Sequence, residues 1–187
     1  MLKCFNAKML KWQGFTLVEL LVSIFIIVLI SGIIFANYRV GGQQFALQRS
    51  ANKLAQDIRR AQAMAMGAAE CPAGTRCAGS VPPGYGIYLS QGNTNYLLYA
   101  DTNPAGGNQN YDSGDASIET INLEKGVEIL SASPSSFSIN FKPPDPTVII
   151  RGSAGDVSTA TITLALQSDT SKTKTITVNN AGLIEIQ

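Results

Sequence analysis

The chain has 187 residues and a formal net charge of +1, which suits one ordinary domain with an extension. It contains no histidine, which excludes histidine-based acid–base catalysis, the usual serine and cysteine triads, and histidine-ligated metals. From Gly67 onward, six basic side chains stand against eleven acidic ones, a net charge of −5. This sign argues against a nucleic-acid-binding domain.

The first 14 residues are basic, with Lys3, Lys8 and Lys11 and no acid. A run of apolar residues follows from 15 to 36, and about 20 such residues suffice for a helix to cross a bilayer. We therefore predict a transmembrane helix over 15–36. The lysines before it, against Arg39 just after it, favour a cytoplasmic N-terminus and an external C-terminal part.

Glu19 is the one ionisable side chain within this apolar run. An unpaired carboxylate at membrane depth costs about 2.5 kcal/mol or more, so an acid there is a functional hypothesis. The alternative is an acid that reaches the aqueous edge of the membrane.

An amphipathic helix is predicted over residues 37–66. Apolar residues recur at four- and three-residue steps, which is the spacing of one helical face: Leu47, Ala51, Leu54, Ile58, Ala61 and Ala65. Charged side chains are expected on the opposite face: Arg49, Lys53, Asp57 and Arg60. The apolar face needs a sheet to cover it.

Cys71 and Cys77 remain once the basic segment with Cys4 is set aside. Two cysteines without histidine make a poor zinc site. If this part lies outside the cytoplasm, a disulfide closing a small loop is expected. The alternative is a pair of free thiols.

Residues 67–187 are predicted to form an antiparallel β domain, because short aromatic and β-branched runs alternate with glycine- and proline-containing turns. A hairpin is expected from 85–90 and 95–100 around Gln91-Gly92-Asn93-Thr94. Further strands are expected at 118–123, 127–130, 137–141, 148–150, 160–166, 173–178 and 182–186. Packed on the amphipathic helix, these strands give an α+β fold.

The N-terminal sequence resembles a known processing site. Lys11-Trp12-Gln13-Gly14, followed by Phe-Thr-Leu-Val-Glu-Leu-Leu-Val over 15–22, is similar to the class III signal peptides of type IV pilins and of type II secretion pseudopilins. Residues 51–65 and 175–184 are similar to H-type pseudopilins and FimT-like minor pilins (GspH/FimT).

This resemblance implies a processing and assembly route. A prepilin peptidase would remove residues 1–14 by cutting between Gly14 and Phe15, and Phe15 would then be N-methylated. Glu19 would pair with the N-terminal amine of a neighbouring subunit, since two buried opposite charges compensate one another. The protein would be a single-pass inner-membrane protein, and residues 67–187 would form its external globular head. An inner-membrane assembly platform would then add it to a filament of pilins or pseudopilins.

The expected function is that of a minor pilin-like structural subunit, neither an enzyme nor a cofactor-binding protein. One alternative is a DNA-binding minor pilin, which would use Arg151, Lys172 and Lys174, although three cations are few for phosphate binding. The other is a major pilin. Secretion, pilus and DNA-uptake systems are not distinguished by these residues.

Asp101, Asn103, Asn108, Asp112 and Asp115 lie in a glycine- and asparagine-rich segment, a candidate calcium loop because calcium takes six to eight oxygen ligands. Its spacing is not that of an EF-hand, and the alternative is a solvated turn.

The basic residues of the amphipathic helix are expected to meet acidic heads of neighbouring subunits or anionic lipid headgroups.

Overall fold

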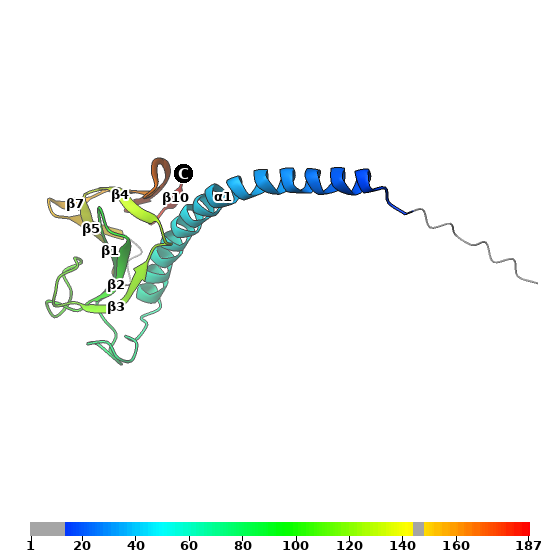
Figure 1. The fold of residues 1–187 in the computed structure, drawn as a ribbon. Coiled ribbons are helices and arrows are strands. Elements are labelled where there is room, and N and C mark those ends of the chain that lie inside the picture. Colours follow the sequence, from blue (N-terminus) through cyan, green and yellow to red (C-terminus); the bar gives the residue numbers. More distant parts are fainter. Residues whose placement is uncertain (1–13, 144–147) are drawn as a thin grey trace, which may run out of the picture. The chain divides into compact units, whose positions relative to one another are not determined.

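The computed structural model describes residues 14–143 and 148–187 (Figure 1). Its contacts divide the chain into two units, which meet between Gly41 and Gly42. A single helix, α1 (Leu17–Met66), belongs to both units. Residues 42–66 of the predicted amphipathic segment 37–66 therefore belong to the same compact unit as the β domain. Most of the predicted leader, residues 1–13, lies outside the described residues.

In the first unit, α1 begins with an N-terminal cap. The Thr16 hydroxyl oxygen accepts a hydrogen bond from the Glu19 backbone N–H at 3.3 Å, and Thr-x-x-Glu is the sequence of a capping box. The segment Leu17–Ile34 has a mean hydropathy of 2.9 and none of it is buried. By length and composition it is suited to cross a membrane.

In the second unit, the predicted apolar face of α1 is confirmed. All six residues of the stripe are buried, and Leu54, Ile58 and Ala61 are completely covered. Ser50 lies on the same face, where its Oγ accepts a hydrogen bond from the Glu124 backbone N–H at 3.0 Å. This polar contact is compatible with burial because the hydroxyl has a partner.

The helix ends in a Schellman motif. The Ala69 N–H donates to the Met64 carbonyl at 3.0 Å, and the Ala68 N–H donates to the Ala65 carbonyl at 3.1 Å. Ala68 takes the left-handed conformation, with φ 45°. The chain thus turns away from the helix one residue after Gly67, although glycine is the usual residue for a left-handed cap.

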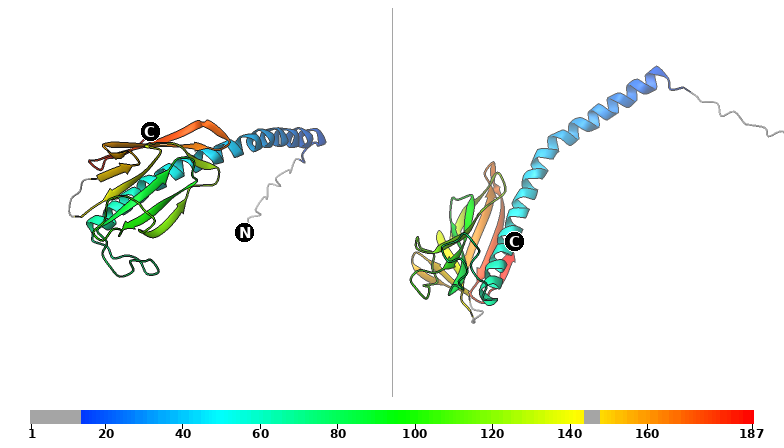
Figure 2. Two further views of the ribbon diagram at one scale, coloured as in Figure 1. Left: turned by 90° about the vertical axis from the view of Figure 1, so that its left-hand side faces the viewer. Right: turned by 90° about the horizontal axis from the view of Figure 1, so that it is seen from below.

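Ten strands follow in the described part of the chain, all paired antiparallel. They are β1 (Gly84–Ser90), β2 (Asn95–Asp101), β3 (Ala116–Asn122), β4 (Val127–Ser133), β5 (Ser136–Phe141), β6 (Val148–Gly152), β7 (Gly155–Val157), β8 (Thr159–Leu166), β9 (Asp169–Asn179) and β10 (Ile184–Ile186). One sheet has the order β3-β2-β1-β5-β6-β7 and the other β10-β9-β8-β4. In both views of Figure 2 the second half of α1 runs along one side of these strands.

The predicted hairpin and antiparallel β domain are confirmed, and the α+β fold is pilin-like. The main differences are strand lengths. β7 was not expected, since its three residues are too short for a periodic signal. β9 begins at Asp169 rather than at Thr173, because β8 continues to pair with it up to Leu166.

The two sheets are joined by hydrogen bonds at their corners. The Gly92 N–H donates to the Ile129 carbonyl at 2.8 Å, and the Ile129 N–H donates to the Asn93 carbonyl at 2.9 Å. One hydrophobic core fills the space between α1 and the strands, and its buried members all lie between Ala46 and Val178. The second unit therefore contains its own core.

Candidate processing segment and the outer face of the head

The predicted cleavage site lies just before α1, in a segment without regular secondary structure. Gly14, Phe15 and Thr16 precede the helix and are exposed, with 78% of Phe15 accessible. No atom lies within 4 Å of the position that a Cβ of Gly14 would occupy. A peptide bond in such a segment is accessible to a protease, so the geometry suits cleavage between Gly14 and Phe15.

Glu19 lies in the first turn of α1 and is exposed. The Ser23 hydroxyl donates to the Glu19 backbone carbonyl at 2.7 Å. A carboxylate in the first turn also stabilises a helix through its macrodipole. Glu19 therefore has a local structural role that we did not predict, alongside its predicted role in assembly.

Two arginines of α1 form ion pairs with acids of their own head. Arg49 pairs with Glu124 at 3.3 Å and Arg60 pairs with Glu119 at 2.8 Å. Both arginines are exposed, as predicted for the face opposite the stripe, and their long side chains reach acids on and just after β3. Both pairs are exposed, so each contributes at most about 1 kcal/mol.

Asp57 provides a third connection between α1 and the sheet. The Tyr96 hydroxyl donates to the Asp57 carboxylate at 2.6 Å. Burial first, and then this hydrogen bond, raises the pKa of the Tyr96 hydroxyl. The tyrosine therefore stays protonated and keeps its donor for Asp57.

The candidate calcium residues lie in and beside the connection between β2 and β3, where their carboxylates accept hydrogen bonds from the loop. Asp115 is buried and accepts from the backbone N–H groups of Thr102 at 2.9 Å, Asn103 at 3.0 Å and Asp112 at 2.9 Å. Asp112 in turn accepts from the Asn103 side chain at 2.8 Å. These bonds connect the two ends of the loop.

Asp101, at the end of β2, holds the middle of the same loop. It accepts from the backbone N–H groups of Asn108 at 3.0 Å and Gln109 at 2.7 Å. Burial raises the pKa of Asp101, and these two hydrogen bonds act in the opposite direction. Among the described residues, no group of three or more His, Cys, Asp or Glu side chains is arranged to hold a metal ion. Calcium binding stays a prediction that this geometry does not favour.

The loop folds back over the outer face, which we define as the side of the six-stranded sheet turned away from α1. The Tyr111 N–H donates to the Ser138 hydroxyl at 2.9 Å, and that hydroxyl donates to the Asn110 side-chain oxygen at 3.2 Å. The Tyr111 ring lies 4.7 Å from the ring of Tyr88 and 5.3 Å from that of Tyr99. Three tyrosines from separate segments thus form one aromatic cluster.

Arg151, one of the residues considered for DNA binding, is engaged within the head. Its guanidinium pairs with Asp156 at 2.5 Å and donates to the Asn108 carbonyl. The hydrogen bond to Asp156 raises the pKa of Arg151. Lys172 and Lys174, the other two residues considered, lie on β9. Arg151 is therefore already engaged by Asp156 and by the Asn108 carbonyl, which does not favour it as a phosphate ligand.

The Arg151–Asp156 pair gives a pH-dependent prediction. The hydrogen bond from Arg151 lowers the pKa of Asp156 from its ordinary value. The stabilisation is therefore present at pH values above the ordinary aspartate pKa and is lost as pH falls through the lower folded-state pKa. Asp156 is 57% exposed, so Asp156→Asn should cost at most about 1 kcal/mol at neutral pH. Urea unfolding of residues 42–187 would measure this. The difference from the parent should vanish in acid, and a difference independent of pH would contradict the assignment.

The structure contains the expected disulfide between Cys71 and Cys77. Cys71 is buried, and the Tyr85 hydroxyl donates beside it to the Ala69 carbonyl at 2.8 Å. Arg76, inside the closed loop, donates to the Ser113 carbonyl at 3.1 Å. The disulfide loop therefore contacts the β2–β3 loop.

Sequence comparison supports the N-terminal assignment. A family model described as the prokaryotic N-terminal methylation motif matches residues 13–35, which include the predicted cleavage site, Glu19 and most of the apolar helix. Neither a curated protein nor a solved structure matched the chain. The chain thus carries a prokaryotic N-terminal methylation motif on an α+β fold, and this combination supports a type IV pilin-like protein.

Proposed function

We propose that the protein is a minor pilin-like (pseudopilin) structural subunit of a type II secretion or type IV pilus filament. A prepilin peptidase cuts between Gly14 and Phe15, and Phe15 is N-methylated. The apolar part of α1 holds the protein in the inner membrane with its N-terminus in the cytoplasm and its head outside. An assembly platform then transfers the subunit into a filament with other pilins or pseudopilins.

The observation that carries this proposal is the methylation motif at residues 13–35. The fully exposed apolar helix Leu17–Ile34 supports it, because such a surface needs either lipid or other helices to cover it. The second unit supports it in a different way, since a core of its own allows the head to stay folded outside the membrane. The disulfide agrees with an oxidising compartment.

The first experiment compares the intact mass and N-terminal sequence of the protein from membranes of cells with and without an active prepilin peptidase. With the peptidase we expect a chain that has lost residues 1–14 and begins at N-methylated Phe15. Without it we expect the chain to begin at Met1.

A Gly14→Val variant gives the matched control. The exposed chain at Gly14 leaves room for a side chain, so the variant should fold and insert as the parent does and differ only in cleavage. An unprocessed parent chain in the presence of active peptidase would contradict the proposed function.

The choice of a minor over a major subunit has its own test. A minor subunit should be present in purified filaments at far below the abundance of the principal pilin, and it should not form filaments when expressed as the sole pilin with the assembly machinery. Filaments made of this chain alone would assign it as a major pilin.

A further inference from the structure

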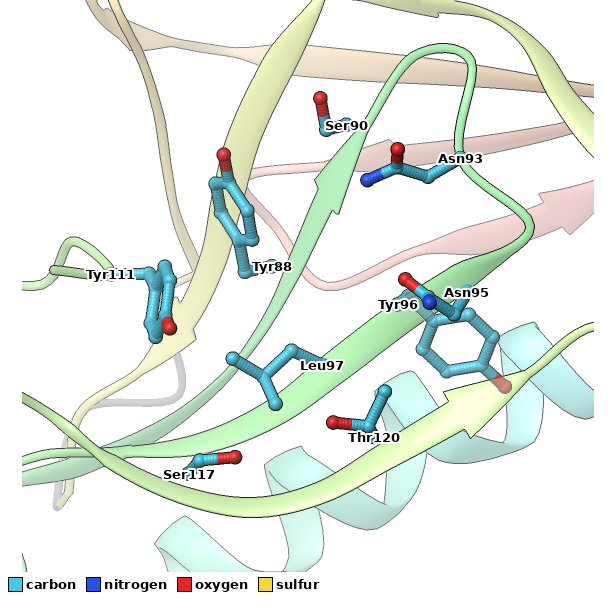
Figure 3. A pocket seen from close by; sticks show the side chains of 9 residues that line it. All are labelled: Tyr88, Ser90, Asn93, Asn95, Tyr96, Leu97, Tyr111, Ser117 and Thr120. Carbon is cyan, nitrogen blue, oxygen red and sulfur yellow. The ribbon is translucent and has the colours of Figure 1, made fainter. Parts of the chain in front are cut away.

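The outer face carries a hollow of about 270 Å³ beside the tyrosine cluster (Figure 3). Its lining comes from β1, β2, β3 and the two loops that follow β1 and β2: Tyr88, Ser90, Asn93, Asn95, Tyr96, Leu97, Tyr111, Ser117 and Thr120. Its volume is near the lower end of the ~300–1,000 Å³ typical of small-ligand sites. A ligand of one or two small rings would fit.

The chemistry of the lining is aromatic and polar but uncharged. Tyr88 and Tyr111 stand on one side, Leu97 lies in the middle of the view, and amides and hydroxyls surround it (Figure 3). Of the described residues that line the hollow, none carries a charge. This argues against a phosphate-bearing ligand, which would need cations.

The polar groups around the hollow are available to a ligand. Among the described residues, the side chains of Asn93, Asn95 and Thr120 have no hydrogen-bond partner. An amide can donate and accept at once, and a hydroxyl can do the same. A sugar hydroxyl also donates one hydrogen bond and accepts another, so it can bond to both kinds of side chain.

The aromatic side of the hollow is held in place by the fold. Tyr111 is fixed through its backbone N–H to Ser138 and by its contact with the rings of Tyr88 and Tyr99. Asn93 is fixed by its carbonyl, which accepts from the Ile129 N–H at 2.9 Å. A site whose walls are already ordered loses less entropy when a ligand binds.

We propose that this hollow binds a neutral sugar. An apolar face of the sugar ring packs against the Tyr88–Tyr111 pair, and its hydroxyls bond to the side chains of Asn93, Asn95 and Thr120. Binding of this kind gives the head a role in contacting glycans. It goes beyond the proposed function and does not depend on filament assembly.

The test uses the full mature chain, purified in a zwitterionic detergent because alkyl glycoside detergents would compete for the site. Ligand-observed NMR titrations would use cellotriose, lactose and tri-N-acetylchitotriose, with single-stranded oligothymidine as the comparison ligand. We expect saturable binding of at least one sugar and none of the oligonucleotide.

Four variants locate the site. Asn95→Ala and Tyr111→Ala should each weaken sugar binding by about tenfold, whereas Tyr88→Phe, which keeps the ring, should weaken it less. Thr175→Ala, on β9 of the other sheet, is the matched control and should bind as the parent does. Because the Asn95 side chain has no partner among the described residues, its variant tests the site without disturbing the loop.

Three outcomes would overturn the proposal. They are no saturable binding of any of the three sugars, binding that Asn95→Ala and Tyr111→Ala leave unchanged, and binding of oligothymidine in place of sugar. The last result would assign the outer face to nucleic acid. None of the three would affect the processing and assembly proposed above.

Discussion

Replacing Asp115 by alanine is expected to lower the free energy of unfolding of the head by about 2–4 kcal/mol. The buried carboxylate accepts hydrogen bonds from three backbone N–H groups of the β2–β3 loop. Bonds to a charged acceptor contribute more than neutral ones, and N–H groups left without a partner carry a desolvation cost. Solvent can reach part of the loop, which keeps the expected loss below the sum of three full bonds.

The measurement is urea unfolding of a fragment comprising residues 42–187, which retains every buried member of the core. Asp115→Asn keeps the shape but replaces one acceptor oxygen by a donor, so it should cost about half as much as alanine. Glu185→Gln, at an exposed position on β10, should leave the midpoint unchanged. An Asp115→Ala midpoint equal to that of the parent would show that the loop is organised by other groups.

The same variant has a consequence on the outer face. The loop that Asp115 and Asp101 fix also places Tyr111 against Tyr88. Loosening the loop should therefore free the Tyr111 ring, and any sugar binding should weaken together with stability. Asp101 and Asp115, which were considered as calcium ligands from the sequence, thus act as hydrogen-bond acceptors that position the Tyr111 ring.

The parts of the fold that follow from local periodicity could be predicted from the sequence. The stripe of α1 depends on spacing within one helix, and the hairpin of β1 and β2 depends on the turn residues between them. The N-terminal motif was also readable, because its residues are contiguous. Each of these signals involves neighbours within a few positions of the chain.

The outer face could not be predicted, because its contacts join segments far apart in sequence. Alternation along β1 and β5 suggests that polar residues such as Ser138 face solvent, whereas the loop covers that side and buries Ser138. Gly86 is a similar case. A Cβ there would lie 2.6 Å from the Tyr99 ring on the neighbouring strand, so the glycine makes room for an aromatic that periodicity cannot place.

The charges of α1 show that a helical wheel gives the exposed face of a helix but not the partners of its side chains. Long side chains on the exposed face can reach acids of the covering sheet, as Arg49 and Arg60 do. The Thr16–Glu19 cap is different, since its spacing was visible in the sequence. Glu19 thus combines a predicted role in the membrane with a local role at the start of the helix.

Replacing Glu19 by glutamine is expected to reduce incorporation into filaments at least tenfold, while processing at Gly14 and membrane insertion continue. This prediction depends on the proposed function. In an apolar filament core the amine of Phe15 would lose its counter-charge, at a cost of about 2.5 kcal/mol or more, which corresponds to more than a tenfold change. The measurement compares the amount of the subunit in sheared filaments with that in membranes.

Ser23→Ala is the matched control, because Ser23 lies one turn further along α1 and bonds only to the Glu19 backbone carbonyl. It should assemble as the parent does. The cap distinguishes the two roles of Glu19, since Thr16→Ala removes the hydrogen bond to the Glu19 N–H but leaves the charge. If Thr16→Ala reduced assembly as much as Glu19→Gln does, the acid would act by starting the helix. If only Glu19→Gln did so, its charge would act between subunits.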